Sequence, residues 1–306
     1  MIAATGDPRR PTVVGHLLTR LPTTEVRRLH NSCSRVSFGA RVALNETIVI
    51  IIRSTSLEED MDDPYAQSAE YIDLLIADAW GLFAPGLSEA LHELGGETGV
   101  TVDLGAGTGR GVSVICASLP DDSPVLAVEP SPALRAVLLA RAHEDERLSS
   151  RVTVSSADAL GVPLPDRVRA LVAMNMIGHL SPDDRHELWA RVVPRLVRGG
   201  RVVVNLAPPT RPVEVPRTRM ASRSVGSLTY EGWASARAIG ERQIRWRMTY
   251  LTRSPEGSPV SEVAVDYDWW VMDEAELREE LAEHGLTVRQ IGHPDAGMYV
   301  ATRPEE

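Results

Sequence analysis

The sequence contains no lysine. All 32 of its basic residues are arginine, against 42 acidic residues, and the formal net charge of the 306-residue chain is −10. The lack of lysine excludes catalysis through a lysine Schiff base or a lysine general base. The negative charge disfavours nucleic acid as a partner, because binding to a phosphate backbone depends on basic side chains that release its counterions. We therefore expect a small-molecule or peptide substrate.

Cysteines and long apolar runs are also scarce. Cys33 and Cys116 are the only cysteines, too few for a disulfide framework or a cysteine-rich metal site, and we predict no metal. The sequence has no run of 18 apolar residues. We expect a cytoplasmic protein with neither a cleaved signal sequence nor a membrane span.

The first 60 residues differ from the rest, with scattered proline and arginine and few helix-start signals. From Met61 the sequence reads like the start of a domain, with acidic residues and Pro64 before an apolar helix face that includes Ile72. We predict that residues 1–60 are a disordered extension or a wrongly assigned start, and that residues 61–306 form the functional domain.

From Val100 onward, short β-branched runs alternate with amphipathic helical runs. This alternation is typical of a parallel sheet covered by helices on both faces, the doubly wound α/β fold. Ser131 and Ser181, each followed by proline, predict helix N-caps. We expect Gly199 and Gly200 to end the second of these helices, and Pro194 to kink or break it early. The predicted strands are residues 100–104, 125–129, 152–155, 170–175 and 201–206.

After the fifth strand the pattern changes. Residues 207–218 read as a loop, and three runs rich in tryptophan and tyrosine then predict antiparallel strands, so residues 208–272 are expected to form an inserted layer. Asp273 is a predicted N-cap for a helix that ends at Gly285. Two antiparallel strands are expected to complete the chain.

The stretch VTVDLGAGTGRG, residues 100–111, is a strand that runs into a glycine loop and then a helix. Such a loop brings backbone N–H groups and a positive helix end close to a ligand. The nicotinamide fingerprint GxGxxG, begun at Gly105, requires glycine at position 110, where the chain has Arg110. The motif present is instead D-x-G-x-G-x-G, formed by Asp103, Gly105, Gly107 and Gly109.

This motif resembles the first motif of the class I S-adenosylmethionine (SAM)-dependent methyltransferases. Three further segments, VLAVEPS, SSADAL and ALVAMNMIGHL, agree in order and spacing, and the resemblance covers about residues 65–303. It implies a seven-stranded, mostly parallel Rossmann-like sheet with a reversed last strand. It also implies SAM as the cofactor.

The resemblance assigns roles to individual residues. Asp103 would orient the loop and the methionyl amino group, and the backbones of Gly105 and Gly107, with Gly109, would border the methionine. Glu129 would hold the ribose hydroxyls. The remaining cofactor-binding assignments are Asp158 for the adenine, the adjacent Ala159, and Asn175 for the region beside the methyl donor.

The methyl acceptor is indicated by the element MNMIGHL together with the inserted strands. This combination resembles actinobacterial amino-sugar N,N-dimethyltransferases, in which the insertion covers the active site and N-terminal tyrosines close over the cofactor. By that resemblance Tyr65 and Tyr71 are expected at the cofactor. Trp233, Tyr250 and Trp269 are candidate substrate contacts, although packing within the sheet explains each of them equally well.

His179 is the candidate catalytic base because its pKa is readily tuned near neutrality, with simple lining of the pocket as the alternative. We predict methylation, including dimethylation, of an amine in a small-molecule or peptide natural product. The alternatives are O- or C-methylation of a secondary metabolite, a NAD-dependent reductase, and a SAM-binding scaffold without activity. The aromatic-rich inserted sheet is a candidate homodimer surface.

Overall fold

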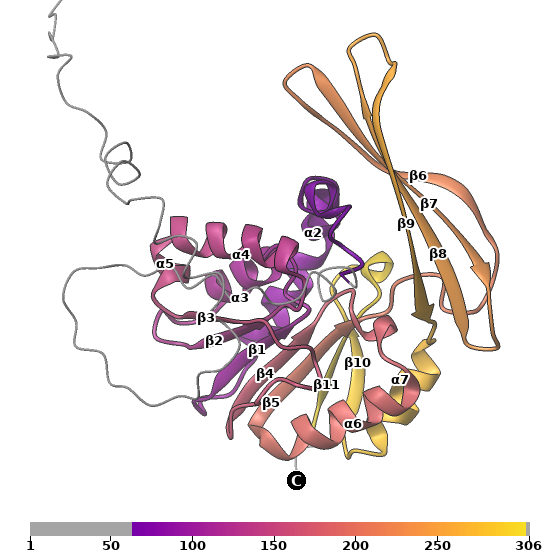
Figure 1. The fold of residues 1–306 in the computed structure, drawn as a ribbon. Coiled ribbons are helices and arrows are strands. Elements are labelled where there is room, and N and C mark those ends of the chain that lie inside the picture. The colour runs from indigo at the N-terminus through magenta and orange to yellow at the C-terminus, as the bar shows by residue number, and fades with distance from the viewer. Residues whose placement is uncertain (1–62, 304–306) are drawn as a thin grey trace, which may run out of the picture. The chain divides into compact units, whose positions relative to one another are not determined.

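A seven-stranded sheet forms the centre of the computed structural model, which describes residues 63–303 (Figure 1). Its strands lie in the order β10-β11-β5-β4-β1-β2-β3, and the two pairings of β11, with β10 and with β5, are antiparallel while the others are parallel. This arrangement confirms the predicted doubly wound sheet with its reversed last strand. The prediction for residues 1–60 lies outside the described residues. The strands are β1 (Val100–Leu104), β2 (Val125–Val128), β3 (Val152–Ser155), β4 (Val168–Ala173), β5 (Leu196–Asn205), β10 (Thr287–Ile291) and β11 (Met298–Thr302).

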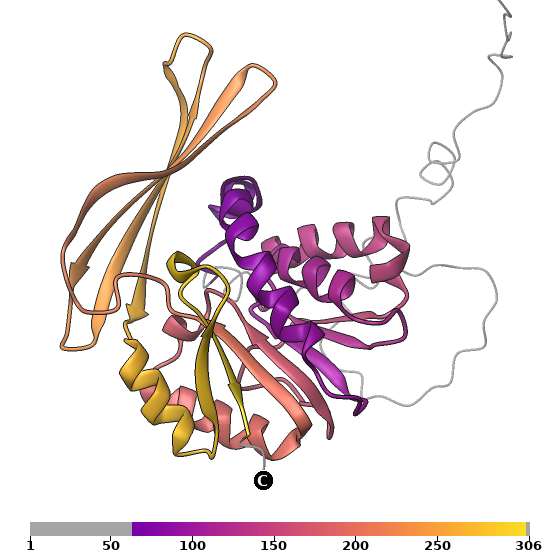
Figure 2. The same cartoon turned by 180° about the vertical axis from the view of Figure 1, so that it is seen from behind.

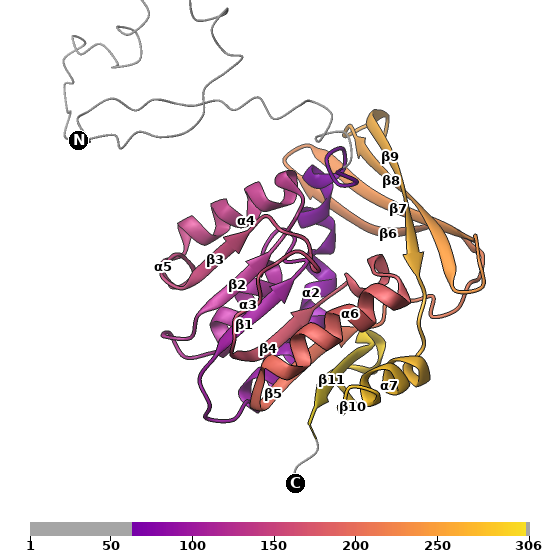
Figure 3. The same ribbon diagram turned by 60° about the horizontal axis from the view of Figure 1, so that its bottom comes forward.

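Helices cover both faces of this sheet (Figures 2 and 3). One face is covered by α2 (Ala69–His92), α3 (Arg110–Ser118), α4 (Pro132–Glu144) and α5 (Glu146–Ser149), and the other by α6 (Pro182–Val192) and α7 (Glu274–Ala282). Short 3-10 turns are η2 (Ile177–His179), η3 (Val193–Arg195) and η4 (Pro294–Ala296). The predicted caps Ser131, Ser181 and Asp273 are confirmed, since each side chain accepts a hydrogen bond from the first turn of its helix.

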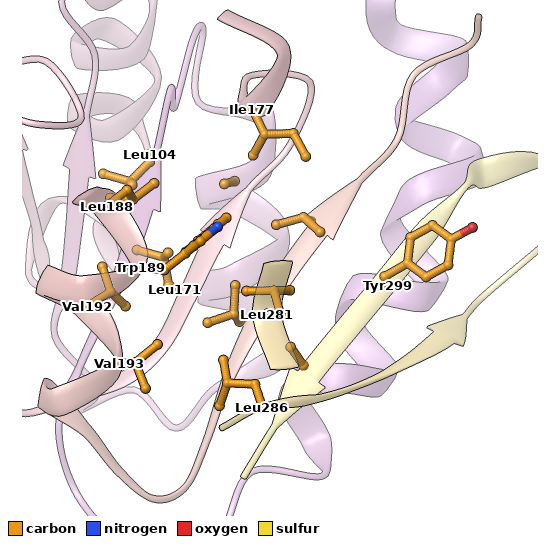
Figure 4. Close-up of a cluster of buried hydrophobic side chains, with 14 of the residues drawn as sticks. Leu104, Leu171, Ile177, Leu188, Trp189, Val192, Val193, Leu281, Leu286 and Tyr299 are labelled. Carbon is orange, nitrogen blue, oxygen red and sulfur yellow. The ribbon is translucent and has the colours of Figure 1, made fainter. Parts of the chain in front are cut away.

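The core under α6 and α7 explains why these helices pack where they do (Figure 4). Leu188 and Trp189 of α6 and Leu281 of α7 are fully buried against the strands, where they meet Leu104 and Leu171. A parallel sheet buried on both faces needs near-continuous apolar strands, and β1 and β4 supply them. The strand ends that carry the polar groups of the site are therefore held rigidly.

Helix α2 is long and apolar enough, by length and composition, to cross a membrane. In the structure it instead packs against α3 and against strands of both sheets, with Tyr71 and Leu87 fully buried. The core helix of a globular protein passes the same test of length and apolarity.

The predicted end of the second capped helix is wrong. Helix α6 ends at Val192, and the early break expected at Pro194 is confirmed. Proline lacks the backbone N–H that continuing the helix would require. The two glycines at positions 199 and 200 lie inside β5, where the pairing with β4 shifts register between Val168 and Ala170. They form an irregularity in the strand and do not stop a helix.

A second, four-stranded antiparallel sheet is inserted between β5 and α7, and we call it the cover sheet. Its strands, in order, are β6 (Val215–Val225), β7 (Leu228–Ala238), β8 (Gln243–Arg253) and β9 (Pro259–Trp270). The prediction of three strands after a loop at residues 207–218 is wrong, because β6 begins at Val215. Pro216 and the frequent arginines are not typical of a strand, so the sequence did not predict β6. Proline is tolerated there because β6 is an edge strand.

Candidate active site

The glycine loop follows β1 and has one open side. Gly105, Gly107 and Gly109 all adopt positive φ angles, of 66°, 55° and 85°. A Cβ atom on Gly105 would approach the Met176 side chain to 2.9 Å, and one on Gly109 would approach Leu138 to 2.5 Å. At Gly107 the nearest atom would lie 3.9 Å away. The loop is therefore packed on two sides and bare at Gly107, where a ligand can approach the backbone.

Glu129 stands beside this bare position, directly after β2. It is 4% exposed, and its two carboxylate oxygens accept hydrogen bonds from the backbone N–H groups of Gly107, at 2.7 Å, and Ser131, at 2.8 Å. Burial raises the pKa of the Glu129 carboxyl. Each oxygen keeps a further acceptor position, so the carboxylate can also accept from a ligand's hydroxyl groups.

Asp103, in β1, is buried without a full set of partners. The side chain is 3% exposed, and within residues 63–303 its Oδ2 has no hydrogen-bond partner. Burial, with a contribution from the charge of Glu129, raises the pKa of Asp103 to about 8. A buried carboxyl oxygen of this kind is costly unless a donor reaches it, so the site suits a ligand with a cationic amino group.

Asp158 and Ala159 follow β3, as predicted. The exposed Asp158 side chain accepts hydrogen bonds through Oδ1 from the backbone N–H groups of Leu160, at 2.9 Å, and Gly161, at 2.5 Å. One oxygen of this carboxylate thus closes the turn after β3. Its role toward an adenine stays a prediction.

Asn175 follows β4 with a φ of 54°, and it is the only non-glycine residue in the described chain with positive φ. Its backbone N–H donates to Asn205 Oδ1 at 2.6 Å, and Asn205 Nδ2 donates to Asn175 Oδ1 at 2.7 Å. Asn205 is 2% exposed at the end of β5. It fixes the strained turn after β4, a role that sequence reasoning missed because asparagine at a strand end has no distinctive pattern.

His179 lies at the end of the turn η2, surrounded by aromatic rings. Its Nε2 is 2.9 Å from the Tyr65 hydroxyl, and its ring centroid lies 5.5 Å from that of Tyr267 and 4.8 Å from that of Trp269. His179 is nevertheless exposed to solvent. Desolvation by these neighbours lowers the pKa of His179 to about 4 and raises the pKa of Tyr267 to about 12. At neutral pH His179 is therefore an uncharged hydrogen-bonding group.

Gly178 explains how the cover sheet reaches this histidine. A Cβ atom at Gly178 would lie 1.9 Å from the Trp269 indole, so the indole rests directly on the η2 backbone. Trp269 is 7% exposed. The glycine of the Ile-Gly-His element is thus required for close approach of the tryptophan.

The other predicted aromatic residues divide between the two faces of the cover sheet. Tyr71 stacks on Tyr250 at 5.1 Å between ring centroids, and the Tyr71 hydroxyl lies 3.1 Å from the Thr252 hydroxyl. This places Tyr71 between α2 and the cover sheet, while the α2 side chain that reaches the glycine loop is Asp73. Trp233 pairs in register with Thr249, so it lies on the face opposite Tyr250, with Arg217 over its ring at 4.4 Å. The structure does not bring Trp233 to the other candidates.

Comparison with known proteins agrees with this geometry. The methyltransferase domain family matches residues 101–200. No curated protein matches the sequence. Among solved structures, the amino pentose methyltransferase CalS10 of Micromonospora echinaspora is similar with a TM-score of 0.60 at 17% identity, over 85% of this chain and 100% of that one.

Two further structures have the same fold. DesVI of Streptomyces venezuelae is similar with a TM-score of 0.59 at 18% identity, over 74% of this chain and 98% of that one. The sugar N-methyltransferase KedS8 of Streptoalloteichus is similar with a TM-score of 0.56 at 17% identity, over 89% of this chain and 100% of that one. At identities of 17–18%, the solved structures show only that the chain shares their fold. The methyltransferase domain is shown by the match to residues 101–200. The chain therefore contains a methyltransferase domain at residues 101–200, on a seven-stranded Rossmann-like fold.

Proposed function

We propose that this methyltransferase uses SAM to methylate an amine nitrogen of a small-molecule or peptide natural product. The observation that carries the proposal is His179, an uncharged imidazole bonded to Tyr65 close to the strained turn after β4. The similarity to structures described as amino pentose and sugar N-methyltransferases supports the choice of a nitrogen acceptor.

The cofactor is SAM, and the residues after β1 and β2 fit it. The unpartnered oxygen of Asp103 suits the cationic methionyl amino group, the bare backbone at Gly107 admits the methionine, and Glu129 has acceptor positions for ribose hydroxyls. Asp158 and Ala159 are the proposed contacts to the adenine. When bound, SAM supplies an electrophilic methyl group on a sulfonium sulfur.

The low pKa of His179 supports nitrogen over oxygen as the acceptor. A hydroxyl group is a poor nucleophile until a base removes its proton, and an imidazole whose pKa is lowered to about 4 is a weak base. An amine needs only to be neutral, and an apolar aromatic pocket favours its neutral form. His179 then holds the Tyr65 hydroxyl, and the Tyr65 oxygen accepts a hydrogen bond from the amine N–H, which orients the nitrogen and leaves its lone pair free to attack.

The cover sheet supplies the remaining walls of the proposed acceptor pocket. Tyr267 and Trp269 of β9 lie against His179, and their rings exclude water from one side of the imidazole. Tyr250 supports this wall by stacking on Tyr71. The proposed acceptor is therefore an amine attached to a largely uncharged scaffold, such as an amino sugar.

The proposal is tested by incubating the full chain and SAM with matched pairs of acceptors that differ only in an amine or a hydroxyl at one position. Mass spectrometry should find a methyl group on the amine member alone. His179→Ala and Tyr65→Phe should each lower the rate by about tenfold to a hundredfold, because general positioning of the nucleophile is lost. Methylation of the hydroxyl member would contradict the assignment of nitrogen.

A further inference from the structure

Asp73 of α2 is the hub of a hydrogen-bond network that none of the proposed catalytic steps uses. Its Oδ1 accepts from Thr108 Oγ1 at 2.6 Å, and the Arg110 guanidinium donates to both carboxylate oxygens at 2.9 Å. Arg141 of α4 donates to the same carboxylate at 2.9 Å and to the Thr108 carbonyl at 2.8 Å. One side chain of α2 therefore holds the glycine loop, the first residue of α3 and the helix α4 together.

The network fixes the charge of Asp73. Partial burial raises the pKa of the Asp73 carboxyl, but hydrogen bonds from Thr108, Arg141 and Arg110 outweigh this and lower it below its ordinary value. The three side chains are about one quarter exposed, with values of 26%, 28% and 24% for Asp73, Arg110 and Arg141. A permanently ionised, bidentate contact of this kind sets geometry as well as adding energy.

The same segment of chain also reaches the acceptor side of the site. Tyr65, eight residues before Asp73, is bonded to His179, and Tyr71, two residues before it, is bonded to Thr252 of the cover sheet. Asp63 accepts a hydrogen bond from the Ser131 hydroxyl at 2.7 Å, next to Glu129. In chain order, residues 63–73 thus contact Ser131 beside Glu129, the histidine, the cover sheet and the glycine loop.

We propose that Asp73 is a positioning residue that couples the cofactor loop to the acceptor pocket. Its hydrogen bonds to Thr108 and Arg110 fix the position of α2 against the glycine loop. The position of α2 in turn fixes the chain segment that carries Tyr65 to His179. The residue Arg110, which takes the place of the third glycine of a nicotinamide fingerprint, has its function in this contact. The inference rests on the proposed use of SAM, since the coupling is between SAM binding and the acceptor pocket.

The network makes a specific prediction about ligand binding. In the wild-type full chain, S-adenosylhomocysteine should bind and should slow amide hydrogen exchange both in residues 105–111 and in residues 63–73. Asp73→Asn should weaken binding about tenfold or more, and the ligand should then protect residues 105–111 but not residues 63–73. Loss of protection in the second segment alone is a result that general destabilisation of the fold would not produce.

Asp78→Asn is the matched control, because Asp78 lies on the same helix and its partner is Arg223 of the cover sheet. It should change the affinity less than twofold and leave both segments protected by the ligand. Arg110→Gln, which removes two of the bonds to Asp73, should give an intermediate loss and serves as the test if Asp73→Asn does not fold.

Two failures can be told apart. If the wild-type chain does not bind S-adenosylhomocysteine, the proposed function is wrong. If the wild-type chain binds it, and Asp73→Asn and Arg110→Gln bind equally well with both segments protected, the proposed coupling is overturned while the proposed function stands.

Discussion

The two sheets of this protein place their charged groups in opposite ways. In the seven-stranded sheet Asp103 and Glu129 are almost completely buried at strand ends, and loops bring backbone N–H groups to Glu129. On the outer face of the cover sheet, charges face solvent in pairs such as Arg247 with Asp266, at 3.1 Å. Buried charges demand fixed partners, whereas exposed pairs contribute little. Under the proposed function, the parallel sheet would hold the cofactor and the aromatic inner face of the cover sheet would contact the acceptor.

The largest expected loss of stability comes from a substitution in the core of the parallel sheet. Leu171→Ala removes a fully buried side chain from β4 and should lower the free energy of unfolding by about 2–5 kcal/mol. Val260→Ala, at a position of β9 that is 60% exposed, should change it by less than about 0.5 kcal/mol. Chemical denaturation measures both. Equal losses would show that the cover sheet is as tightly packed as the parallel sheet.

Removing the acidic residue after β2 should abolish most of the cofactor affinity. Glu129→Ala loses charge-assisted hydrogen bonds worth about 1.5–3 kcal/mol, and also leaves the Gly107 N–H without its acceptor. We expect the dissociation constant for S-adenosylhomocysteine, measured by calorimetry, to rise by about tenfold to a hundredfold. Glu262→Ala, at an exposed acidic residue of the cover sheet, is the control and should have no effect. Normal binding by Glu129→Ala would show that another residue holds the ribose.

The contact between the two sheets can be broken at Gly178. Gly178→Ala places a methyl group where the Trp269 indole lies and should cost about 1–3 kcal/mol of stability through overpacking. Because Trp269 is displaced from His179, turnover of the acceptor should fall further than S-adenosylhomocysteine affinity does. Comparing the two readouts in one variant checks this, and an equal fall in both would place Trp269 at the cofactor.

The pH dependence of cofactor binding tests Asp103. Its folded pKa is raised to about 8, so at about pH 6 the free carboxyl is protonated and must lose its proton to pair with a cationic amino group. Affinity for S-adenosylhomocysteine should therefore increase as pH rises from about 6 to 8, by at most roughly tenfold per pH unit. Asp103→Asn should weaken binding and flatten the dependence. A flat profile in the wild-type chain would mean that Asp103 is already ionised.

The raised pKa of Asp103 also means that its ionised form lowers the stability of the ligand-free protein. A carboxyl whose folded pKa lies above its unfolded value destabilises the folded state, with no effect below the unfolded pKa and the full effect above about pH 8. Asp103→Asn should therefore raise the melting temperature of the ligand-free chain at alkaline pH, as expected where a site is kept for binding.

Much of the parallel sheet could be predicted from the sequence because its signals are local. β-branched runs, the caps at Ser131 and Ser181, and the positive-φ glycines after β1 each follow from a few neighbouring residues. The match of the motif to the methyltransferase domain is confirmed by the family comparison. The assignment of individual residues to SAM stays a prediction.

The rest depends on contacts between distant segments. Asp73 reaches Thr108 across 35 positions of the chain, and Asn205 reaches Asn175 across 30, and neither pairing leaves a pattern in the sequence. Strand β6 was hidden because an exposed edge strand carries few apolar residues. Alternation within one strand does not give the register between strands, so the sequence could not show that Trp233 and Tyr250 lie on opposite faces of the cover sheet.

The most direct test of the central claim is titration of the full chain with S-adenosylhomocysteine and, separately, with NADH, by calorimetry. A SAM-dependent methyltransferase should bind the first at one site per chain and should not bind the second. Binding of NADH with no binding of S-adenosylhomocysteine would contradict the account.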